Sequence, residues 1–341
     1  MAGVEISSGT VRVVLGRRED ARLRVVGRGD APLGEGAVSG GLVTDRASAA
    51  EALRAAFAVA EHVQRADRVV LAIDSDDIRT FHALTAFERD DLRSAMGASE
   101  ESRAVREATA DANARAAAAT EEDASLRGVA TAQLHDEVAA LALDGRGLRS
   151  LVGHRGRVVE VWTDVTLGSL VVSGAATATL EVARRRGSIV SGAYALGRLA
   201  AESTVSDAGI VRLGSDLTAL AIVREGRLVA TRVFALGRTA LAARAGKAED
   251  DGRVWADCVV ASLRGLDGPP PARWLFAGVP ESLLSLPKAL GAVIGEIRGD
   301  EVDIEPLTVA LATRVYGDGG LRPDDLVAAG AAVLGAGVYE A

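Results

Sequence analysis

Two segments of this chain have the residue types that bring backbone close to a phosphate group. Each is an apolar strand, a tight turn of glycine and hydroxyl residues, and a second apolar strand, at residues 4–15 and again at residues 211–223. Small side chains let the backbone N–H groups of such turns approach an anion. The polar residue just before each turn, where a carboxylate would hold a hydrated metal ion, is Glu5 in the first copy and Arg212 in the second. The two copies predict two facing lobes.

The opposite charges of Glu5 and Arg212 predict a charge-assisted pair across the cleft, which would fill the metal position with protein. Asp216 would also direct a carboxylate at phosphate oxygens, whereas a magnesium triphosphate needs acids for the metal and donors for the phosphates. The residues favour an inactive site. Weak nucleotide binding without metal and true ATP hydrolysis stay open, as does the interpretation of both turns as ordinary Gly/Ser hairpins.

Composition limits the class of protein. The 341 residues are 48 % apolar but only 3 % aromatic, so two domains can each bury a core of Val, Leu, Ala and Ile. A net charge of -8 speaks against a nucleic-acid surface. The single basic run, residues 184–186, is interpreted as a solvated helix end. The lone Cys258 excludes an internal disulfide and is consistent with a reducing cytoplasm.

No membrane anchor is visible in the sequence. No run of about 18 apolar residues occurs, as a spanning helix requires. The last segment, residues 328–341, lacks the basic face and bulky apolar residues of an amphipathic anchor. We therefore expect a cytoplasmic protein.

Strands and helices are expected to alternate, which indicates α/β layers. Residues 69–73 form a continuous apolar run typical of a buried strand. Residues 88–125, rich in alanine, predict one or two peripheral helices. Residues 157–165 predict an antiparallel strand with one solvated face, and residues 180–201 a helix and a loop. Residues 273–279 predict a strand that ends in glycine.

Other polar residues give weaker signals. Asp74, Asp76 and Asp77 directly follow the predicted buried strand and are interpreted as a polar turn. The four histidines have no metal-ligand spacing, so we expect them at the surface.

The doubled strand-turn-strand unit and the order of elements resemble those of bacterial FtsA, the actin homologue of the division ring, and of PilM of type IV pilus assembly. Residues 40–45 are similar to the segment that leads into the first helix of FtsA, and residues 275–278 to the adenosine loop. Residues 328–330 are similar to the final hinge helix. The resemblance covers nearly the whole chain. It implies an α/β, actin-like (ribonuclease H-like) two-lobed fold with an FtsA/PilM-type inserted subdomain.

The resemblance also implies domain boundaries. Residues 1–83, 169–204 and 330–341 would form the first actin-like lobe, and residues 84–168 the inserted subdomain. Residues 205–329 would form the second lobe. A reduced adenine-side subdomain is expected within it, at about residues 239–269.

The resemblance implies that the two hairpins and the adenosine loop form a vestigial nucleotide cleft. Its expected residues are Glu5, Ser7, Ser8, Gly9, Thr10, Arg212, Gly214, Ser215, Asp216, Thr218 and Gly278. The lysine of the family's first loop is missing, and Arg212 stands where the family has an aspartate. We expect no catalytic residue, no metal and no cofactor, with ATP and magnesium as the alternative.

The implied function is that of a scaffold in cell division or envelope machinery, a pseudo-ATPase that self-associates as a filament or dimer or docks partner peptides. The alternatives are an active ATP-hydrolysing actin-like protein and a PilM-like pilus-assembly adaptor. The expected partners are the chain itself and a division or pilus protein, including a peptide of a membrane partner.

Overall fold

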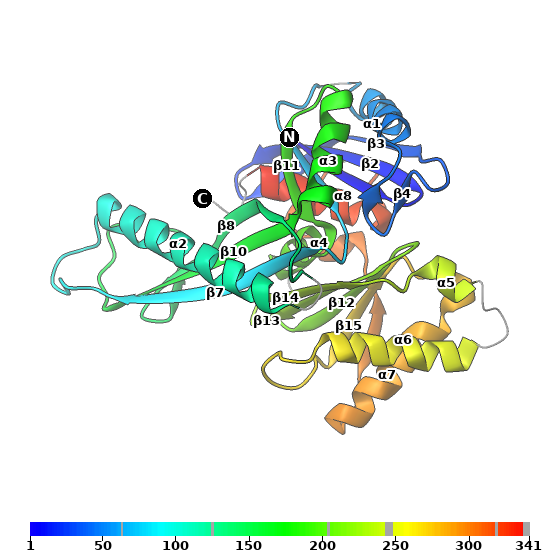
Figure 1. Cartoon of the computed structure of the whole chain (residues 1–341). Helices are drawn as coiled ribbons and strands as arrows, with labels where there is room; N and C mark the ends of the chain where they lie inside the picture. Colours follow the sequence, from blue (N-terminus) through cyan, green and yellow to red (C-terminus); the bar gives the residue numbers. More distant parts are fainter. Residues whose placement is uncertain (63, 124–125, 203–204, 243–247, 318–319, 337–341) are drawn as a thin grey trace.

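The structure, a computed structural model, describes residues 1–62, 64–123, 126–202, 205–242, 248–317 and 320–336. One lobe is built on a six-stranded sheet of order β11-β6-β1-β2-β3-β17 (Figure 1). Its strands are β1 (Ala2–Ser7), β2 (Thr10–Glu19), β3 (Arg22–Pro32), β6 (Val69–Ile73), β11 (Gly187–Ser191) and β17 (Val315–Tyr316). β1, β2 and β3 form the predicted antiparallel meander, and β6 runs parallel to β1. The strand predicted at residues 69–73 is therefore confirmed, next to β1 in the sheet.

The second lobe repeats this plan in a five-stranded sheet of order β14-β13-β12-β15-β16. Its strands are β12 (Ala208–Leu213), β13 (Thr218–Arg224), β14 (Arg227–Phe234), β15 (Arg273–Ala277) and β16 (Asp303–Pro306). β12 pairs antiparallel with β13 and parallel with β15, just as β1 pairs with β2 and β6. The helices α5 (Arg238–Ala242), α6 (Ala248–Ser262) and α7 (Ser285–Arg298) belong to this lobe, and α6 packs on α7.

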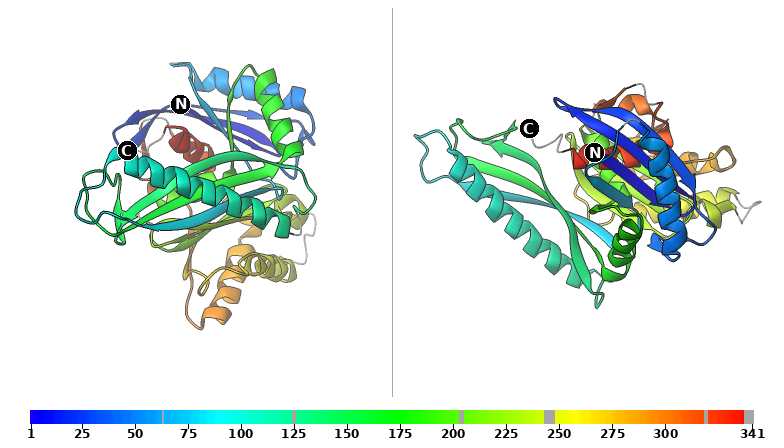
Figure 2. Two further views of the ribbon diagram at one scale, coloured as in Figure 1. Left: turned by 60° about the vertical axis from the view of Figure 1, so that its left-hand side comes forward. Right: turned by 90° about the horizontal axis from the view of Figure 1, so that it is seen from above.

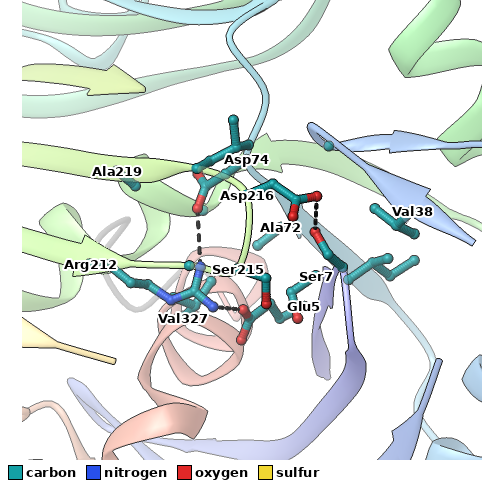
Figure 3. A pocket seen from close by; sticks show the side chains of 16 residues that line it. Glu5, Ser7, Val38, Ala72, Asp74, Arg212, Ser215, Asp216, Ala219 and Val327 are labelled. Carbon is teal, nitrogen blue, oxygen red and sulfur yellow. Dashed lines mark hydrogen bonds and ion pairs between the residues drawn. The ribbon is translucent and has the colours of Figure 1, made fainter. Parts of the chain in front are cut away.

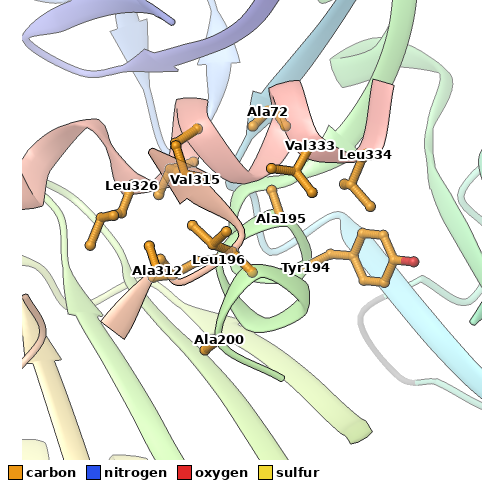
Figure 4. Close-up of a cluster of buried hydrophobic side chains, with 14 of the residues drawn as sticks. Ala72, Tyr194, Ala195, Leu196, Ala200, Ala312, Val315, Leu326, Val333 and Leu334 are labelled. Carbon is orange, nitrogen blue, oxygen red and sulfur yellow. The ribbon is translucent and has the colours of Figure 1, made fainter. Parts of the chain in front are cut away.

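Two helices lie between the sheets and join the lobes. α4 (Gly192–Ala201) and α8 (Leu326–Gly335) contact each other, α4 against β13 and β14, and α8 against β1 and β6. Their side chains form one buried cluster with residues of both sheets (Figure 4). The close approach of α8 depends on Gly3, where a Cβ atom would overlap the backbone of Ala328 and Ala332. Because this core is continuous, the two lobes hold their turns facing each other.

The outer face of the first sheet is covered by α1 (Arg46–Ala60) and α3 (Leu170–Val182), which lie side by side (Figures 1 and 2). Asp45 caps α1 by accepting hydrogen bonds from the N–H groups of Ala47 and Ser48. β4 (Val38–Ser39) and β5 (Leu42–Val43) form a small ribbon that precedes α1.

A third sheet, of order β7-β10-β8-β9, projects from the lobes (Figure 2). It comprises β7 (Ile78–Glu88), β8 (Thr131–Leu143), β9 (Arg146–Leu148) and β10 (Val158–Ser169). α2 (Ala98–Glu122) packs on it through alanines at four-residue spacing, which bury one side of the helix: Ala104, Ala108, Ala112 and Ala116. This unit includes most of the segment predicted as an inserted subdomain.

The antiparallel strand predicted at residues 157–165 is present as β10, in which Val158, Glu160 and Trp162 are partly exposed and the residues between them are buried. The expectation for residues 180–201 differs from the structure. The segment 180–201 contains the strand β11, which the short apolar run of residues 189–190 did not reveal. The remaining short elements are three 3-10 turns: Glu281–Leu283, Val309–Leu311 and Pro323–Asp325.

The division into lobes, insert and reduced subdomain stays a prediction. Within it, residues 203–204, 243–247 and 337–341 lie outside the described part of the chain. The described helices include none that is long and apolar enough to cross a bilayer.

Candidate functional site between the lobes

The ends of β1 and β12 bring the two predicted turns together. Glu5 lies near the end of β1 in the first lobe and Arg212 near the end of β12 in the second. The predicted ion pair between them is present, with Nη2 of Arg212 donating to Oε1 of Glu5 (Figure 3). Only 2 % of the Glu5 side chain and 15 % of the Arg212 side chain are exposed. The pair therefore joins the lobes in a largely desolvated place.

Arg212 also binds a second carboxylate. Its Nη1 lies 3.2 Å from Oδ2 of Asp74, so the guanidinium lies between two acids (Figure 3). Glu5 in turn has a second arginine, because Nη1 of Arg12 lies 3.5 Å from its Oε2. Arg12 contacts Asp324 at the same distance of 3.5 Å. The result is a chain of alternating charges in which Glu5, Asp74 and Asp324 each have an arginine partner.

The electrostatics keep Arg212 charged. Burial lowers its pKa, but the carboxylates of Glu5 and Asp74 outweigh burial and hold the pKa above the ordinary arginine value. Burial raises the pKa of Glu5, against the opposing effect of Arg212 and Arg12. Loss of either arginine would therefore raise the pKa of Glu5 further.

Asp74 is the residue of the site that sequence reasoning missed. It follows β6 at the carboxyl end of that strand and accepts hydrogen bonds from N–H of Ala193, at 2.8 Å, and from Oγ of Ser191, at 3.4 Å. Both donors lie at the start of α4, where the helix dipole favours an anion. A Cβ atom on Gly192 would lie 2.7 Å from the Asp74 carboxylate, so the glycine makes room for it.

A signal for Asp74 was available. The carboxyl ends of parallel strands in α/β sheets are where binding residues gather, and Asp74 directly follows such a strand. A polar turn at the end of a strand gives the same local pattern, and for that reason the prediction stopped at a turn.

A second contact joins the turns. Oγ of Ser8, in the first turn, donates to Oδ2 of Asp216, in the second, at 2.6 Å. The same carboxylate oxygen accepts from N–H of Gly40 at 3.2 Å. Asp216 therefore uses donors of the first lobe that could otherwise face a phosphate. Ser215 is bound within its own lobe, where it accepts from Nη2 of Arg238 at 3.2 Å.

The space left between the lobes is small. A cavity of about 30 Å³ remains, which suffices for one or two waters and is far below the size of a ligand pocket. Its lining comprises Glu5, Ile6, Ser7, Ser8, Val38, Gly41, Ala72, Asp74, Gly192, Arg212, Gly214, Ser215, Asp216, Leu217, Ala219 and Val327.

The other predicted residues lie elsewhere around the turns. Ser7 and Thr10 close the first turn, with Oγ of Ser7 donating to the carbonyl of Thr10 at 3.0 Å. Gly9 stands at the exposed tip. Thr218 points into the core of the second lobe, where its hydroxyl donates to the carbonyl of Leu236 and accepts from Nε1 of Trp255.

Gly278 follows β15 with φ of 73°, and a Cβ atom there would lie 2.7 Å from the carbonyl oxygen of Leu213. Glycine is therefore required at this position both for its backbone conformation and for the close approach to β12.

The site does not fit magnesium and ATP in this arrangement. A hard cation needs free carboxylate oxygens. Those of Glu5 are taken by Arg212 and Arg12, and those of Asp74 by Arg212 and the N–H of Ala193. Asp216 adds negative charge where phosphates would need donors. Among the described residues no group of three or more acidic, histidine or cysteine side chains is placed to hold a metal ion.

Comparison of the sequence with protein families and with curated proteins gives no match. Solved structures do match. PilM in the PilM–PilN type IV pilus biogenesis complex is 17 % identical, with a TM-score of 0.60 over 98 % of both chains. The ethanolamine utilization protein EutJ from Carboxydothermus hydrogenoformans is 12 % identical, with a TM-score of 0.48 over 97 % of this chain and 88 % of EutJ. A Bacteroides thetaiotaomicron protein with an actin-like ATPase fold and unknown function is 8 % identical, with a TM-score of 0.41 over 90 % of each chain.

The whole-chain match to PilM agrees with the two repeated meanders, the helices α4 and α8 between them and the projecting third sheet. This chain therefore has a mixed α/β fold of the actin-like ATPase type, in the form seen in PilM.

Proposed function

We propose that this chain is a PilM-like adaptor of pilus assembly, a cytoplasmic pseudo-ATPase that docks a pilus protein and does not turn over ATP. The observation that carries the proposal is the position of Arg212, whose guanidinium bridges Glu5 and Asp74 where a metal nucleotide would need free acids. The chain itself thus supplies a cation that pairs with two carboxylates of the cleft. The whole-chain likeness to PilM of a PilM–PilN complex supports pilus assembly over the division ring as its setting.

A groove beside the third sheet is the docking surface we propose for that partner. Its volume is about 1120 Å³, enough for several residues of an extended peptide. One wall is β8, from which residues 135–141 all line the groove, as expected where the edge of a strand and not one of its faces forms the wall. The opposite wall is formed by the turn at residues 224–229 and by Arg198 and Glu202 of α4.

The edge of β8 is open to a further strand. β9 pairs only with Leu141, Ala142 and Leu143, and within the described ranges no other strand is hydrogen-bonded to β8 on that side. The N–H and C=O groups of residues 132–140 on this edge can therefore pair with an extended segment of the partner, as in β-strand addition.

The groove is held in shape by buried polar contacts. The hydroxyl oxygen of Tyr194 on α4 lies 3.0 Å from Oε2 of Glu137 of β8 and 3.1 Å from Oδ2 of Asp164 of β10, and its one proton is donated to one of these carboxylates at a time. Nη2 of Arg198 lies 3.1 Å from Glu137. Because these bonds link α4 to the third sheet, the two walls keep a fixed separation and the site is preformed.

The test is calorimetric titration of the chain with the purified PilN-type protein of the same organism. Ala139→Trp, which fills the groove, should weaken binding at least tenfold, whereas Ala114→Trp on the exposed side of α2 should leave it within twofold. Binding that both variants retain, or no binding by the unchanged chain, would refute this docking surface. Self-association as a filament or dimer stays a separate prediction, which sedimentation velocity would check.

A further inference from the structure

The outer face formed by α1 and α3 combines exposed aliphatic side chains with a basic rim. α3 buries Val172, Ala176 and Leu180 against the lobe. Its opposite side carries Leu170 and Val171, which are 52 % and 66 % exposed, and Val182 at its end, which is 51 % exposed. Leu170, Gly174, Ala178 and Val182 recur every four residues, so they form one continuous stripe along the helix.

Five exposed arginines lie around the end of this stripe. Arg184 and Arg186 follow α3 directly, Arg65 and Arg68 precede β6, and Arg54 lies on α1. Gly187 pairs with Val69 in the sheet, so Arg186 and Arg68 enter neighbouring strands side by side. Nη1 of Arg54 donates to the carbonyl of Val182 at 3.1 Å, which places it at the same end of α3.

Arg185, between Arg184 and Arg186, holds this loop in place. Arg185 forms two hydrogen bonds with Glu61, at 2.7 and 2.6 Å, and its guanidinium lies 4.0 Å from the centre of the Phe57 ring. This anchors the loop on α1. Arg184 and Arg186 on either side are left exposed, and within the described part of the chain neither forms an ion pair.

The rim is positive in a chain of net charge -8. The five arginines stand beside three exposed acids of the same face: Glu51, Asp67 and Glu181. An excess of positive charge here means that the negative charge is carried elsewhere on the molecule. An anionic surface would therefore attract this face and repel much of the rest, which would orient the protein.

We propose that the α1/α3 face, defined by these aliphatic side chains and arginines, rests on an anionic lipid bilayer. Aliphatic groups along α3 and guanidinium groups at its Val182 end lie on one face, as an interfacial contact requires, since the former enter the headgroup boundary and the latter meet lipid phosphates. A nucleic acid fits less well, because among the described residues this face offers no exposed Phe, Tyr or Trp ring on which a base could stack. Residues 328–341 lack both of these features, so the contact does not depend on that segment.

The test is cosedimentation with vesicles of phosphatidylcholine alone and with added phosphatidylglycerol. We expect binding only to vesicles with phosphatidylglycerol, and at least tenfold weaker binding in 0.5 M salt, where surface charges are screened. Arg184→Glu with Arg186→Glu should reduce binding at least tenfold. Leu170→Ser with Val171→Ser should reduce it as well. Arg103→Glu with Arg106→Glu, an equal charge change on the exposed side of α2, should leave it within twofold.

Three results would overturn the proposal: no binding of the unchanged chain to phosphatidylglycerol vesicles, an equal loss in the α2 control, or a dimer in the absence of vesicles that Leu170→Ser with Val171→Ser dissociates. All six positions are largely exposed or lie on a helix surface, so unchanged thermal unfolding of each variant shows that a loss concerns the surface and not the fold. Failure of this test leaves the adaptor proposal intact, because the groove beside β8 is a different surface.

Discussion

Arg212 forms an ion pair with Glu5, and the two residues hold corresponding positions in the two hairpins of the chain. The duplicated fold thus places opposite charges opposite each other, 207 residues apart in sequence. Asp74 completes the arrangement from the neighbouring strand of the first sheet. Because all three side chains meet where the lobes face each other, the contact joins the two lobes.

Removal of the guanidinium should destabilise the protein strongly. In Arg212→Met, Glu5 loses its nearest cation and Asp74 its only ion-pair partner among the described residues, so we expect a loss of about 3–5 kcal/mol in the free energy of unfolding, as for a broken buried pair. Urea unfolding measures it. The matched control is Arg253→Met, whose pair with Glu296 is exposed, with an expected change of at most about 1 kcal/mol. Equal losses of stability in Arg212→Met and Arg253→Met would contradict a stabilising role of the contact between the lobes.

The pair should also show energetic coupling. Glu5→Gln removes the charge that burial already disfavours, so Arg212→Met should cost less in the Glu5→Gln background than in the unchanged chain. A double-mutant cycle by urea unfolding should give a coupling energy of about 1–3 kcal/mol. If the double variant loses as much stability as the two single variants together, the two side chains do not interact energetically, which would contradict a stabilising ion pair.

Two glycines with opposite surroundings give a test of the fold. In Gly3→Ala the new Cβ atom would overlap backbone atoms of α8, so we expect a loss of at least about 1–3 kcal/mol or failure to fold. Gly174→Ala meets no atom within 4 Å on α3, and should stabilise the protein by about 0.5–1 kcal/mol. Thermal unfolding distinguishes them, and a stable Gly3→Ala variant would refute the packing of α8 on β1.

The acid stability of the protein should depend on Asp164. Burial raises its pKa, but His82 at 2.7 Å, together with Arg198 and Tyr194, outweighs burial and holds the pKa below the ordinary value. A carboxyl group whose pKa is lowered by folding stabilises the fold above its unfolded pKa of about 3.9, and this contribution is lost as the pH falls through the folded value.

Asp164→Asn should therefore be less stable than the unchanged chain at pH 7, and the difference should shrink as the pH falls below about 4. Urea unfolding between pH 7 and pH 3 measures this difference. Asp76→Asn, at an exposed position, is the control: its free energy of unfolding should follow that of the unchanged chain over the whole pH range. If the difference in free energy of unfolding between Asp164→Asn and the unchanged chain grows on acidification, folding does not lower the pKa of Asp164.

The sequence predicted those parts of the fold and site that repeat or lie within one element. The hairpins were visible because their pattern occurs twice, and the charges of Glu5 and Arg212 predicted their pairing once two lobes were expected. Asp74 was missed because its partner comes from a strand 138 residues away, and because a polar residue at the end of a strand fits a turn as well as a binding site. The polar contacts of His82 with Asp164 and of His135 with Glu137 were missed for the same reason, so the surface position expected for these histidines was wrong: both are half-buried.

The central claim is that Arg212 and its two carboxylates occupy the place of a metal nucleotide. Calorimetric titration of the unchanged chain with ATP and Mg²⁺, followed by an assay of released phosphate, tests it most directly. We predict no heat of binding up to millimolar ATP and no phosphate release above the rate without protein. Binding of ATP at micromolar concentration, together with release of phosphate by the unchanged chain, would contradict the account.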